Sequence, residues 1–423
     1  MIEKKVLKNG ITLISKQMPY VRSVSIGCWF KTGSINENET NNGVAHLIEH
    51  MLFKGTKTKD FKAIAVFTDK MGGELNAFTS KESTCFYTSV LEKHMNDALE
   101  ILSDIIINPL FLNEEIEKEK SVVLEEINLY EDSPEDLLID MTSEVVFRGT
   151  PLMRPILGTK ESIGRLNRQS ILEYYNKHYV AKNLIISVAG NFDERTLENT
   201  IYNKFKNIKD EEIIKQEGIS NCFNAGILSK NKDIEGNHFN ISFPGISYDS
   251  AEVYQIMALN NIVGGSVSSR LFQRIREKNG LVYSIDTSNN FLSDSGTFDI
   301  EYSVNDDNID ELNKLLVSEI DQLRKDGITE EELYIAKEQL LSSYLLGLED
   351  SVSVMNWLGR SIIHSDRVKT EKEVENNIEK ITVEQVNNLI KIVFGKGKIA
   401  LTAVGKKADI NSKRVYEYLT NNI

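Results

Sequence analysis

The sequence predicts an α+β protein built from two similar halves. Segments that alternate like β-strands and segments with the helical period follow one another along the 423 residues, and some strands are joined directly as hairpins. The helix–turn–helix layout of residues 95–126 returns in residues 309–343. We therefore expect two similar α/β units, each an antiparallel-rich sheet covered by helices.

A polar stretch separates the two halves. Residues 206–237 are rich in Lys, Glu, Asp and Asn and lack a clear hydrophobic period, whereas strand-like segments precede and follow them. We predict a first domain over residues 1–210, a linker over 211–236 and a second domain over 237–423.

The first half contains a well-signalled helix at residues 44–52. Asn41 or Asn42 offers an N-cap before it, and Gly55 offers a stop after it. Its apolar positions fall on one stripe, formed by Val44, Leu47, Ile48, Met51 and Leu52.

The opposite side of this helix carries the pattern H-x-x-E-H, formed by His46, Glu49 and His50. Residues four apart lie on one helix face, so the two imidazoles can bind one metal ion, and the glutamate points the same way. A solvated polar face would also contain such residues, and further ligands are needed to decide between the two interpretations. The second half has no such pattern.

A further ligand is sought in the helical pattern of residues 113–132. Its buried stripe is predicted to be Ile116, Val123, Ile127 and Tyr130. On the same wheel Glu125 faces water, whereas Glu126 lies at the edge of the inward face, on the same flank as Glu119. Most charges on such a helix are merely solvated, so periodicity alone leaves Glu126 only a candidate.

Residues 72–90 read as a hairpin. Two strand-like segments, 75–80 and 84–90, are joined by Lys81-Glu82-Ser83. Asn76 lies in the first of them, and a strand-start or turn asparagine is its ordinary interpretation.

The second half offers another pair of polar candidates. Asn279-Gly280 is typical of a helix end, and a strand follows at residues 281–285. Arg276 in the last helical turn suits the helix dipole, and a tyrosine in a strand, such as Tyr283, is usually a core residue.

Composition excludes several classes of function. A net charge of −14 and a sequence pI near 5.1 argue against nucleic-acid binding and against adhesion to anionic membranes. Three scattered cysteines form neither a CxxC motif nor a disulfide framework, and the N-terminus has no signal-like apolar core. We expect a cytoplasmic protein without a membrane span.

The motifs together resemble a known family. H-L-I-E-H followed by Glu126 is similar to the pitrilysin, insulin-degrading enzyme and mitochondrial-processing-peptidase family of inverzincins. The resemblance covers essentially the whole chain, and its size is that of the short bacterial processing proteases. The strings that carry it are GVAHLIEHMLFKGT, MGGELNAFTSKEST, EKSVVLEEI and SSRLFQRIREKNGLVYSI.

The resemblance implies a zinc endopeptidase. It implies that His46, His50 and Glu126 bind one Zn²⁺ per chain, that Glu49 is the general base for an attacking water, and that Glu119 orients a ligand histidine. It also implies a clamshell of two facing units.

Substrate contacts follow from the same resemblance. Asn76, Ala77 and Phe78 would lie on an edge strand on which an extended peptide docks as an added strand. Arg276 and Tyr283 would hold the substrate backbone and the developing oxyanion.

Two further expectations concern partners and activity. Short family members that carry both motifs in one chain are often homodimers, so we expect a homodimer acting on unfolded peptides. The alternative function is a noncatalytic scaffold or substrate-gripping subunit of the same fold, but such members typically have a damaged zinc motif, and this motif is intact.

Overall fold

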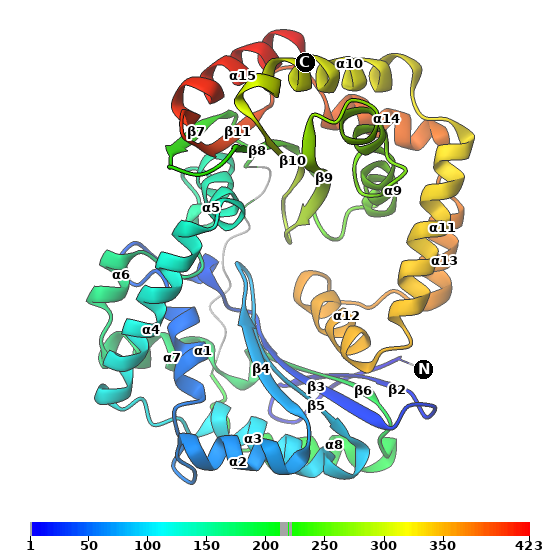
Figure 1. Ribbon diagram of the computed structural model, residues 1–423. Coiled ribbons are helices and arrows are strands. Elements are labelled where there is room, and N and C mark those ends of the chain that lie inside the picture. The colour runs from blue at the N-terminus through cyan, green and yellow to red at the C-terminus, as the bar shows by residue number, and fades with distance from the viewer. Residues whose placement is uncertain (1, 212–218, 220–221) are drawn as a thin grey trace. The chain divides into compact units, whose positions relative to one another are not determined.

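The computed structural model describes residues 2–211, 219 and 222–423, and it confirms the predicted α+β class (Figure 1). The chain forms two compact units, each with one sheet covered by helices. Unit 1 comprises Met1–Leu129, Arg154–Glu217 and Leu345–Val368, and unit 2 comprises Tyr130–Met153, Gly218–Tyr344 and Lys369–Ile423.

The units interleave along the chain. Each unit takes one segment from the opposite half of the sequence, so neither coincides with one of the sequential ranges 1–210 and 237–423. Part of the predicted linker 211–236 lies outside the described residues, and Gly226–Asn231 within it forms a strand, β7, instead of a linker.

The sheet of unit 1 has the strand order β1-β2-β6-β3-β5-β4. The β2–β6 pair is parallel and the other pairs are antiparallel, which leaves β4 as an edge strand. The predicted hairpin is confirmed, because β4 pairs with β5 through the turn at residues 80–83. The strands are β1 (Ile2–Val6), β2 (Thr12–Gln17), β3 (Ser23–Phe30), β4 (Glu74–Thr79), β5 (Thr84–Leu91) and β6 (Leu184–Gly190).

Helices cover both faces of this sheet. The main apolar core lies on one face, where the side chains of Ile26, Cys28 and Phe30 are buried against the helices of the first half. The helices are α1 (Val44–Leu52), α2 (Phe61–Met71), α3 (Met95–Ile107), α4 (Asn113–Asp132, which crosses into unit 2 after Leu129), α6 (Lys160–Arg165), α7 (Arg168–His178), α8 (Glu194–Phe205) and α12 (Ser351–His364). Short 3₁₀ turns are η1 (Ser34–Asn36), η2 (Glu92–His94) and η4 (Ala181–Asn183).

The opposite face of the sheet is covered by α12, a segment from the second half of the sequence (Figure 1). Its fit depends on glycines: a Cβ on Gly359 would lie 2.2 Å from the Trp29 ring, and one on Gly27 would lie 2.4 Å from the Met355 sulfur. Close packing of this kind explains why a distant segment belongs to unit 1.

The sheet of unit 2, with the order β7-β11-β8-β10-β9, repeats the arrangement of β2-β6-β3-β5-β4 in unit 1 and has no counterpart of β1. Its first and last strands in sequence, β7 and β11, pair in parallel, as β2 and β6 do in unit 1, and the hairpin strand β9 occupies the edge, as β4 does. The strands are β7 (Gly226–Asn231), β8 (Asn237–Pro244), β9 (Val282–Phe291), β10 (Gly296–Val304) and β11 (Ala400–Gly405).

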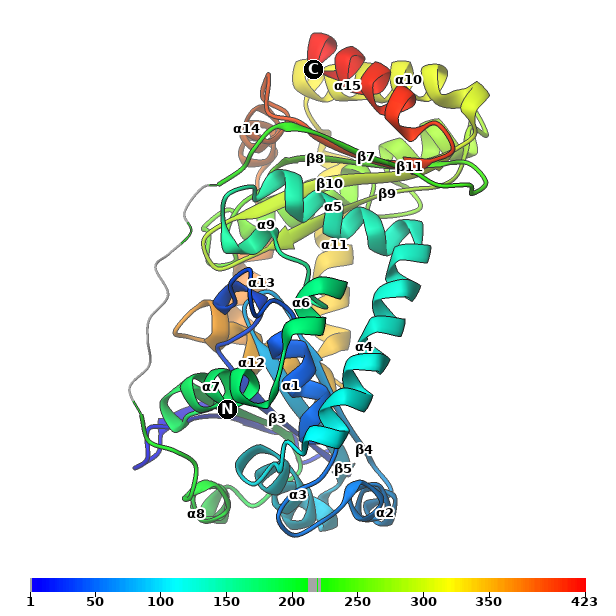
Figure 2. The ribbon, with the colours of Figure 1, turned by 90° about the vertical axis from the view of Figure 1, so that its left-hand side faces the viewer.

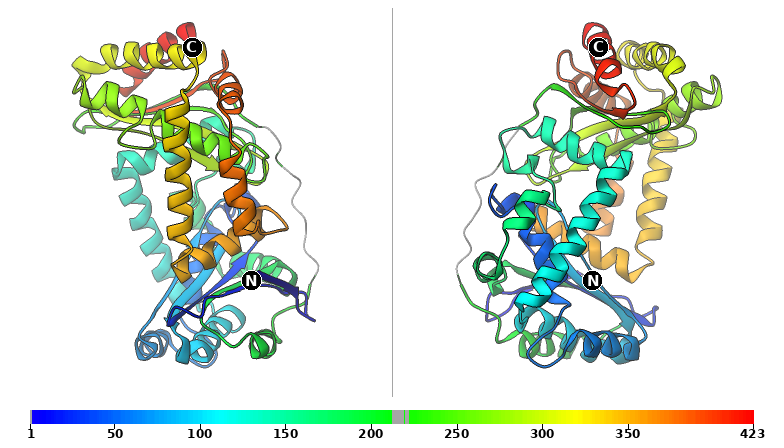
Figure 3. Two further views of the ribbon diagram at one scale, coloured as in Figure 1. Left: turned by 90° about the vertical axis from the view of Figure 1, so that its right-hand side faces the viewer. Right: turned by 60° about the vertical axis from the view of Figure 1, so that its left-hand side comes forward.

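The helices of unit 2 include one from the first half, α5, which packs on β7, β8 and β11, while α15 packs on β7 and β11 and against α10 (Figure 3). The exchange is therefore reciprocal between the halves. The helices are α5 (Pro134–Val146), α9 (Val253–Val263), η5 (Phe272–Glu277, a π-helix), α10 (Ile309–Asp326), α11 (Glu330–Gly347, which crosses into unit 1 after Tyr344), α13 (Glu371–Glu379), α14 (Val383–Val393) and α15 (Ala408–Asn422). The 3₁₀ turns are η3 (Pro151–Met153) and η6 (Asp306–Asn308).

An acidic cluster lies on the unit 2 sheet. Glu301 on β10 is the cross-strand partner of Asp286 on β9. Burial, together with the negative charges of Asp299, Asp286 and Glu135, raises the pKa of Glu301 to about 7. Burial likewise raises the pKa of Asp286. Like charges at directly opposed positions are unfavourable in a sheet.

We expect Glu301→Gln to stabilise the protein above pH 7. Because the folded chain keeps a proton on Glu301 that the unfolded chain releases near its ordinary pKa, this residue lowers stability as pH rises from about 4.5 to 7. The gain at pH 8 is about 2 kcal/mol, below the ~3 kcal/mol that the pKa difference would give, because the side chain is partly exposed. Thermal unfolding at pH 4.5 and pH 8 measures it.

The control for this prediction is Glu311→Gln, which neutralises an exposed acid of α10 in the same unit. Equal changes in unfolding temperature for the two variants at both pH values would contradict the prediction that Glu301 lowers stability at high pH.

Among the helices in the described part of the chain, none is both long enough and apolar enough to cross a membrane.

Candidate metal centre

The predicted metal-binding helix is present as α1, with its apolar stripe buried and its motif on the other side. Its predicted start was wrong, because neither Asn41 nor Asn42 caps it: Gly43 occupies the N-cap position with a left-handed φ of 89°. The carboxylate of Glu37 instead accepts hydrogen bonds from the first turn, at 2.8 Å from the backbone nitrogens of Gly43 and Ala45. The helix ends at Leu52, before the predicted stop at Gly55.

Helix α4 runs beside α1 (Figure 2), and its Glu119 and Glu126 side chains contact the histidines of α1. Glu125 is exposed, whereas the Glu126 side chain is 34 % exposed and points its Oε2 at both histidines. The Oε2 atom lies 3.8 Å from His46 Nε2 and 3.6 Å from His50 Nε2. The structure thus brings together the three residues that the sequence marked as candidate ligands.

This donor set fits a zinc ion. Two donors on a tetrahedral zinc, each about 2.0–2.1 Å from the metal, lie roughly 3.3 Å apart, so small side-chain rotations suffice. Two imidazoles and one carboxylate are donors that zinc accepts. Burial and, to a lesser extent, the charge of His50 together lower the pKa of His46 to about 3, so its imidazole is neutral and can donate a lone pair.

The two histidines are held differently. His50 Nδ1 lies 3.1 Å from Oε2 of the buried Glu119, whose other oxygen lies 2.7 Å from Nζ of Lys54. His46 Nδ1 is buried and has no hydrogen-bond partner among the described residues. The Lys54 contact was not foreseen, although Lys54 follows His50 by four residues.

Glu49 lies beside the cluster on the same helix. The hydroxyl of Thr79, on edge strand β4, donates a hydrogen bond to Glu49 Oε2. Burial raises the pKa of Glu49, while the Thr79 hydrogen bond and the nearby His50 act in the opposite direction. Thr79 therefore orients the predicted base, and no feature of the sequence indicated this contact.

The predicted substrate strand is β4, an edge strand of the sheet. Asn76 is exposed, and its Oδ1 accepts a hydrogen bond from the Ala77 backbone nitrogen at 2.8 Å. Phe78 packs edge-on against Trp29, with ring centroids 5.4 Å apart, and lies 6.2 Å from the Tyr87 ring. The structure thus places this predicted trio beside Thr79 on one strand, and their contacts with substrate stay a prediction.

Arg276 and Tyr283 are neighbours within unit 2. The Arg276 guanidinium lies 4.6 Å from the Phe272 ring centroid and 5.9 Å from that of Tyr283. The ordinary interpretation of a strand tyrosine is wrong at this position, because Tyr283 is 87 % exposed. Both side chains can therefore meet a ligand, and their roles stay predictions.

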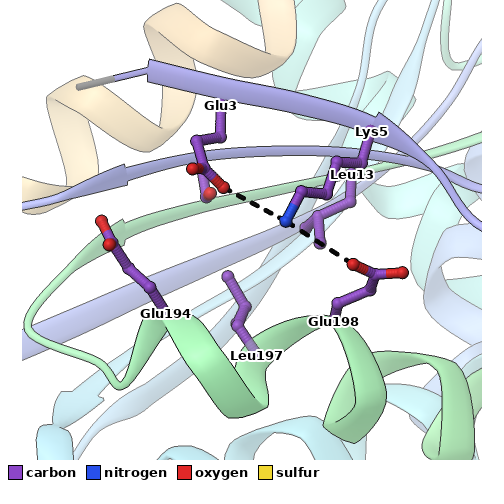
Figure 4. A pocket seen from close by; sticks show the side chains of 7 residues that line it. Glu3, Lys5, Leu13, Glu194, Leu197 and Glu198 are labelled. Atoms are coloured by element: carbon purple, nitrogen blue, oxygen red, sulfur yellow. Dashed lines mark ion pairs between the residues drawn. The ribbon is translucent and has the colours of Figure 1, made fainter.

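A separate small pocket lies between β1, β2 and α8 of unit 1 (Figure 4). Its one cation, Lys5, is ion-paired with Glu3 at 3.3 Å and Glu198 at 3.5 Å. The lining residues include none of the candidate site residues, so this pocket is not part of the metal centre.

Sequence comparison places the chain in a family. The profile described as "Insulinase (Peptidase family M16)" matches residues 12–160, which contain the histidines and Glu126, and "Peptidase M16 inactive domain" matches residues 165–340. The chain belongs to the peptidase M16 family. The description of the second profile agrees with the absence of H-x-x-E-H from the second half of this M16 chain.

Individual M16 relatives extend the match. "Uncharacterized zinc protease YmxG" of Bacillus subtilis is 37% identical over 395 residues, covering 93% of this chain and 96% of that protein. An "Uncharacterized zinc protease" of Rickettsia felis is 37% identical over 389 residues, covering 92% and 94%. A crystal structure described as a peptidase M16 inactive domain from Pseudomonas fluorescens shares the fold, with a TM-score of 0.90 at 19% identity over 96% of this chain and 98% of that one.

Proposed function

We propose that the protein is a zinc-dependent endopeptidase that hydrolyses unfolded peptides or short protein segments. The observation that carries the proposal is the convergence of His46, His50 and Glu126, with Glu49 on the same helix face. Relatives that are named zinc proteases support the metal and the reaction class.

Three protein donors suit a catalytic rather than a structural site. A structural zinc site closes all four positions with protein ligands, whereas a catalytic one leaves a position open. The cluster found among the described residues has three members, and we propose that it holds one Zn²⁺ per chain. A zinc ion held there would polarise the substrate carbonyl and lower the pKa of a coordinated water to roughly 7.

Proton transfer in this mechanism is carried out by Glu49. The Glu49 carboxylate takes a proton from the attacking water while the water oxygen forms a bond to the peptide carbonyl carbon. As the C–N bond breaks, Glu49 returns that proton to the leaving amine. Thr79 holds one carboxylate oxygen of Glu49, and Glu119 fixes the His50 ring, so both groups keep their orientation through the cycle.

The substrate is proposed to bind in extended form along β4. An edge strand offers unpaired backbone groups, and pairing with them gives affinity with little dependence on side chains. We propose that Asn76 reaches the backbone near the scissile bond, while Ala77 and Phe78 border the peptide side chains. This mode of binding requires an unfolded segment, because a folded strand already has partners.

Arg276→Ala is expected to slow cleavage without removing zinc. We propose that Arg276 and Tyr283 stabilise the substrate backbone and the developing oxyanion, and loss of one such donor costs about 10²–10³-fold in kcat. Cleavage kinetics of a quenched peptide, with zinc content measured on the same sample, check the effect. Lys278→Ala removes an exposed charge from the same segment as the control, and equal kinetics for both variants would return Arg276 to a helix-end role.

The test of the proposed function is a cleavage map on a peptide library. Cleavage should stop on addition of a chelator and return with zinc, and the cut positions would define the substrate preference. A zinc-loaded protein that binds library peptides but cleaves none would favour the alternative, a substrate-gripping or scaffold role. A homodimer and a cytoplasmic location remain predictions, which sedimentation and cell fractionation would test.

A further inference from the structure

The helix that carries the metal motif does not cap itself. Gly43 at its N-cap has no side chain, and the amides of its first turn need acceptors. The Val44 nitrogen bonds to the Asn41 carbonyl at 3.0 Å, whereas the Gly43 and Ala45 nitrogens bond to the two carboxylate oxygens of Glu37. The Glu37 side chain therefore fastens the start of α1 from six residues upstream.

The fastening point is buried and tightly packed. Glu37 is only 4 % exposed, and its Oε2 also accepts a hydrogen bond from Asn42 Nδ2 at 2.8 Å. The same Asn42 amide donates to the Pro155 carbonyl at 2.9 Å. A Cβ on Gly43 would lie 2.6 Å from the Leu157 carbonyl oxygen, so the turn before α1 has no room to shift against that neighbouring loop.

The hydrogen bonds of Glu37 affect the position of His46 more than that of His50. His50 has Glu119 behind its ring, but the buried Nδ1 of His46 has no partner in the described part of the chain. Glu126 approaches only the Nε2 side of the His46 ring, and within the described residues no hydrogen bond holds the Nδ1 side. The position of the ring therefore follows mainly from the backbone of the first helical turn. That backbone is bonded to Glu37 at Ala45, the residue directly before His46.

We propose that Glu37 is a positioning residue for the zinc centre: its carboxylate, clamped on the Gly43 and Ala45 amides and on Asn42, sets the first turn of α1 and through it the His46 ligand. The inference rests on the proposed function only in taking His46 as a zinc ligand. In many metal sites a carboxylate fixes the orientation of a ligand histidine by a direct hydrogen bond to its ring. Glu37 would do so indirectly, through the backbone.

The chemistry requires a carboxylate. Three N–H groups point at the two oxygens of Glu37, and an anion at a helix N-terminus is also stabilised by the helix dipole. Glutamine has the same shape but replaces one acceptor by an NH₂ group, which would then face N–H donors. The pKa of Glu37 is raised to about 7, because the effect of burial exceeds the opposing effect of its hydrogen bonds with Ala45, Asn42 and Gly43. Tests therefore belong at pH 8, where most of the group is ionised.

The experiment measures zinc affinity of the full-length protein by competition with a chromogenic chelator at pH 8. Glu37→Gln is expected to weaken zinc binding by about 10–100-fold, the loss typical of groups that orient a metal ligand. The control is Glu39→Gln, an identical change at an exposed position two residues away, which should bind zinc like the wild type. Equal affinity of the two variants would overturn the proposal.

A second readout separates positioning from mere stability. The cobalt-substituted Glu37→Gln protein should show an altered ligand-field absorption spectrum, because the His46 donor is displaced. A purely structural residue would lower the unfolding temperature of the metal-free protein and leave both the spectrum and the affinity unchanged, and that result would also overturn the proposal.

Two further outcomes keep the test decisive. If Glu37→Gln does not fold, Asn42→Ala is the alternative, because it removes one hydrogen-bond donor to the same carboxylate. It should weaken zinc binding several-fold, and unchanged zinc affinity in that variant would contradict the proposal. If the wild type binds zinc but cleaves no peptide, the proposed function fails while the comparison of Glu37→Gln with Glu39→Gln still decides the role of Glu37.

Discussion

Replacing Glu49 by glutamine is expected to abolish peptide cleavage while the protein keeps its zinc. Glutamine preserves the shape of the side chain, and its amide oxygen can still accept the Thr79 hydroxyl hydrogen bond. It cannot take up a proton from the attacking water, and general-base catalysis of this kind contributes on the order of 10²–10⁴-fold to the rate.

The measurement combines cleavage of a quenched peptide with elemental analysis of the purified variant. Glu39→Gln, a neutralising change on the loop before α1, provides the control and should cleave normally. Turnover at the wild-type rate by a zinc-loaded Glu49→Gln protein would remove Glu49 as the base. Loss of zinc from this variant would instead make Glu49 a ligand, which is a different site from the one proposed.

Periodicity predicted the helical faces of the site well. On α1 the apolar stripe is buried and the H-x-x-E-H residues are only partly covered. On α4 the wheel separated exposed Glu125 from Glu126 and put Glu119 on the inward flank, and Glu119 is buried in the structure. These outcomes follow because a helix fixes the direction of each side chain relative to its buried stripe.

The same wheel failed at the end of α4. Tyr130 was expected in the buried stripe but is exposed. The first segment of unit 1 ends at Leu129, so beyond this residue the helix has passed the core against which its earlier turns pack. A period in the sequence does not say where the packing partner of a helix ends.

Contacts between elements could not be read from the sequence. The cap of α1 is supplied by Glu37 rather than by the adjacent asparagines, and Thr79 reaches Glu49 from a strand. Each contact depends on how a turn or a strand lies against the helix, and neither residue type is unusual at its position. Local capping rules favour the nearest polar residue, and tertiary packing overrode them.

The exchange of helices between the units was likewise not predictable. The repeat of strands and helices in the two halves correctly indicated two sheets, and five strands of the first correspond in order to the five strands of the second. An amphipathic pattern shows that α5 and α12 must bury an apolar stripe, but not against which sheet. Gly27 and Gly359 allow α12 to pack closely on the sheet of unit 1, but the sequence alone does not show that these two glycines lie at that contact.

Glu126→Ala is expected to lose zinc, whereas Glu125→Ala should keep it. The two residues are adjacent on α4, carry the same charge and have the same helix propensity, so the pair isolates the effect of direction alone. Glu126 Oε2 lies within 3.8 Å of both histidine Nε2 atoms, and Glu125 is exposed to solvent. Since groups that merely orient a ligand are worth 10–100-fold in metal affinity, loss of one of three donors should cost more than about 100-fold.

Elemental analysis after dialysis, followed by chelator competition, measures this difference without any assay of cleavage. Glu126→Ala should retain the wild-type fold, because its side chain is a third exposed and fills no apolar core. Zinc loss from Glu125→Ala with retention by Glu126→Ala would reverse the assignment of the two faces of α4. Retention by both variants would show that two imidazoles suffice or that another donor completes the site, and the three-donor arrangement on which the hydrolytic mechanism depends would have to be abandoned.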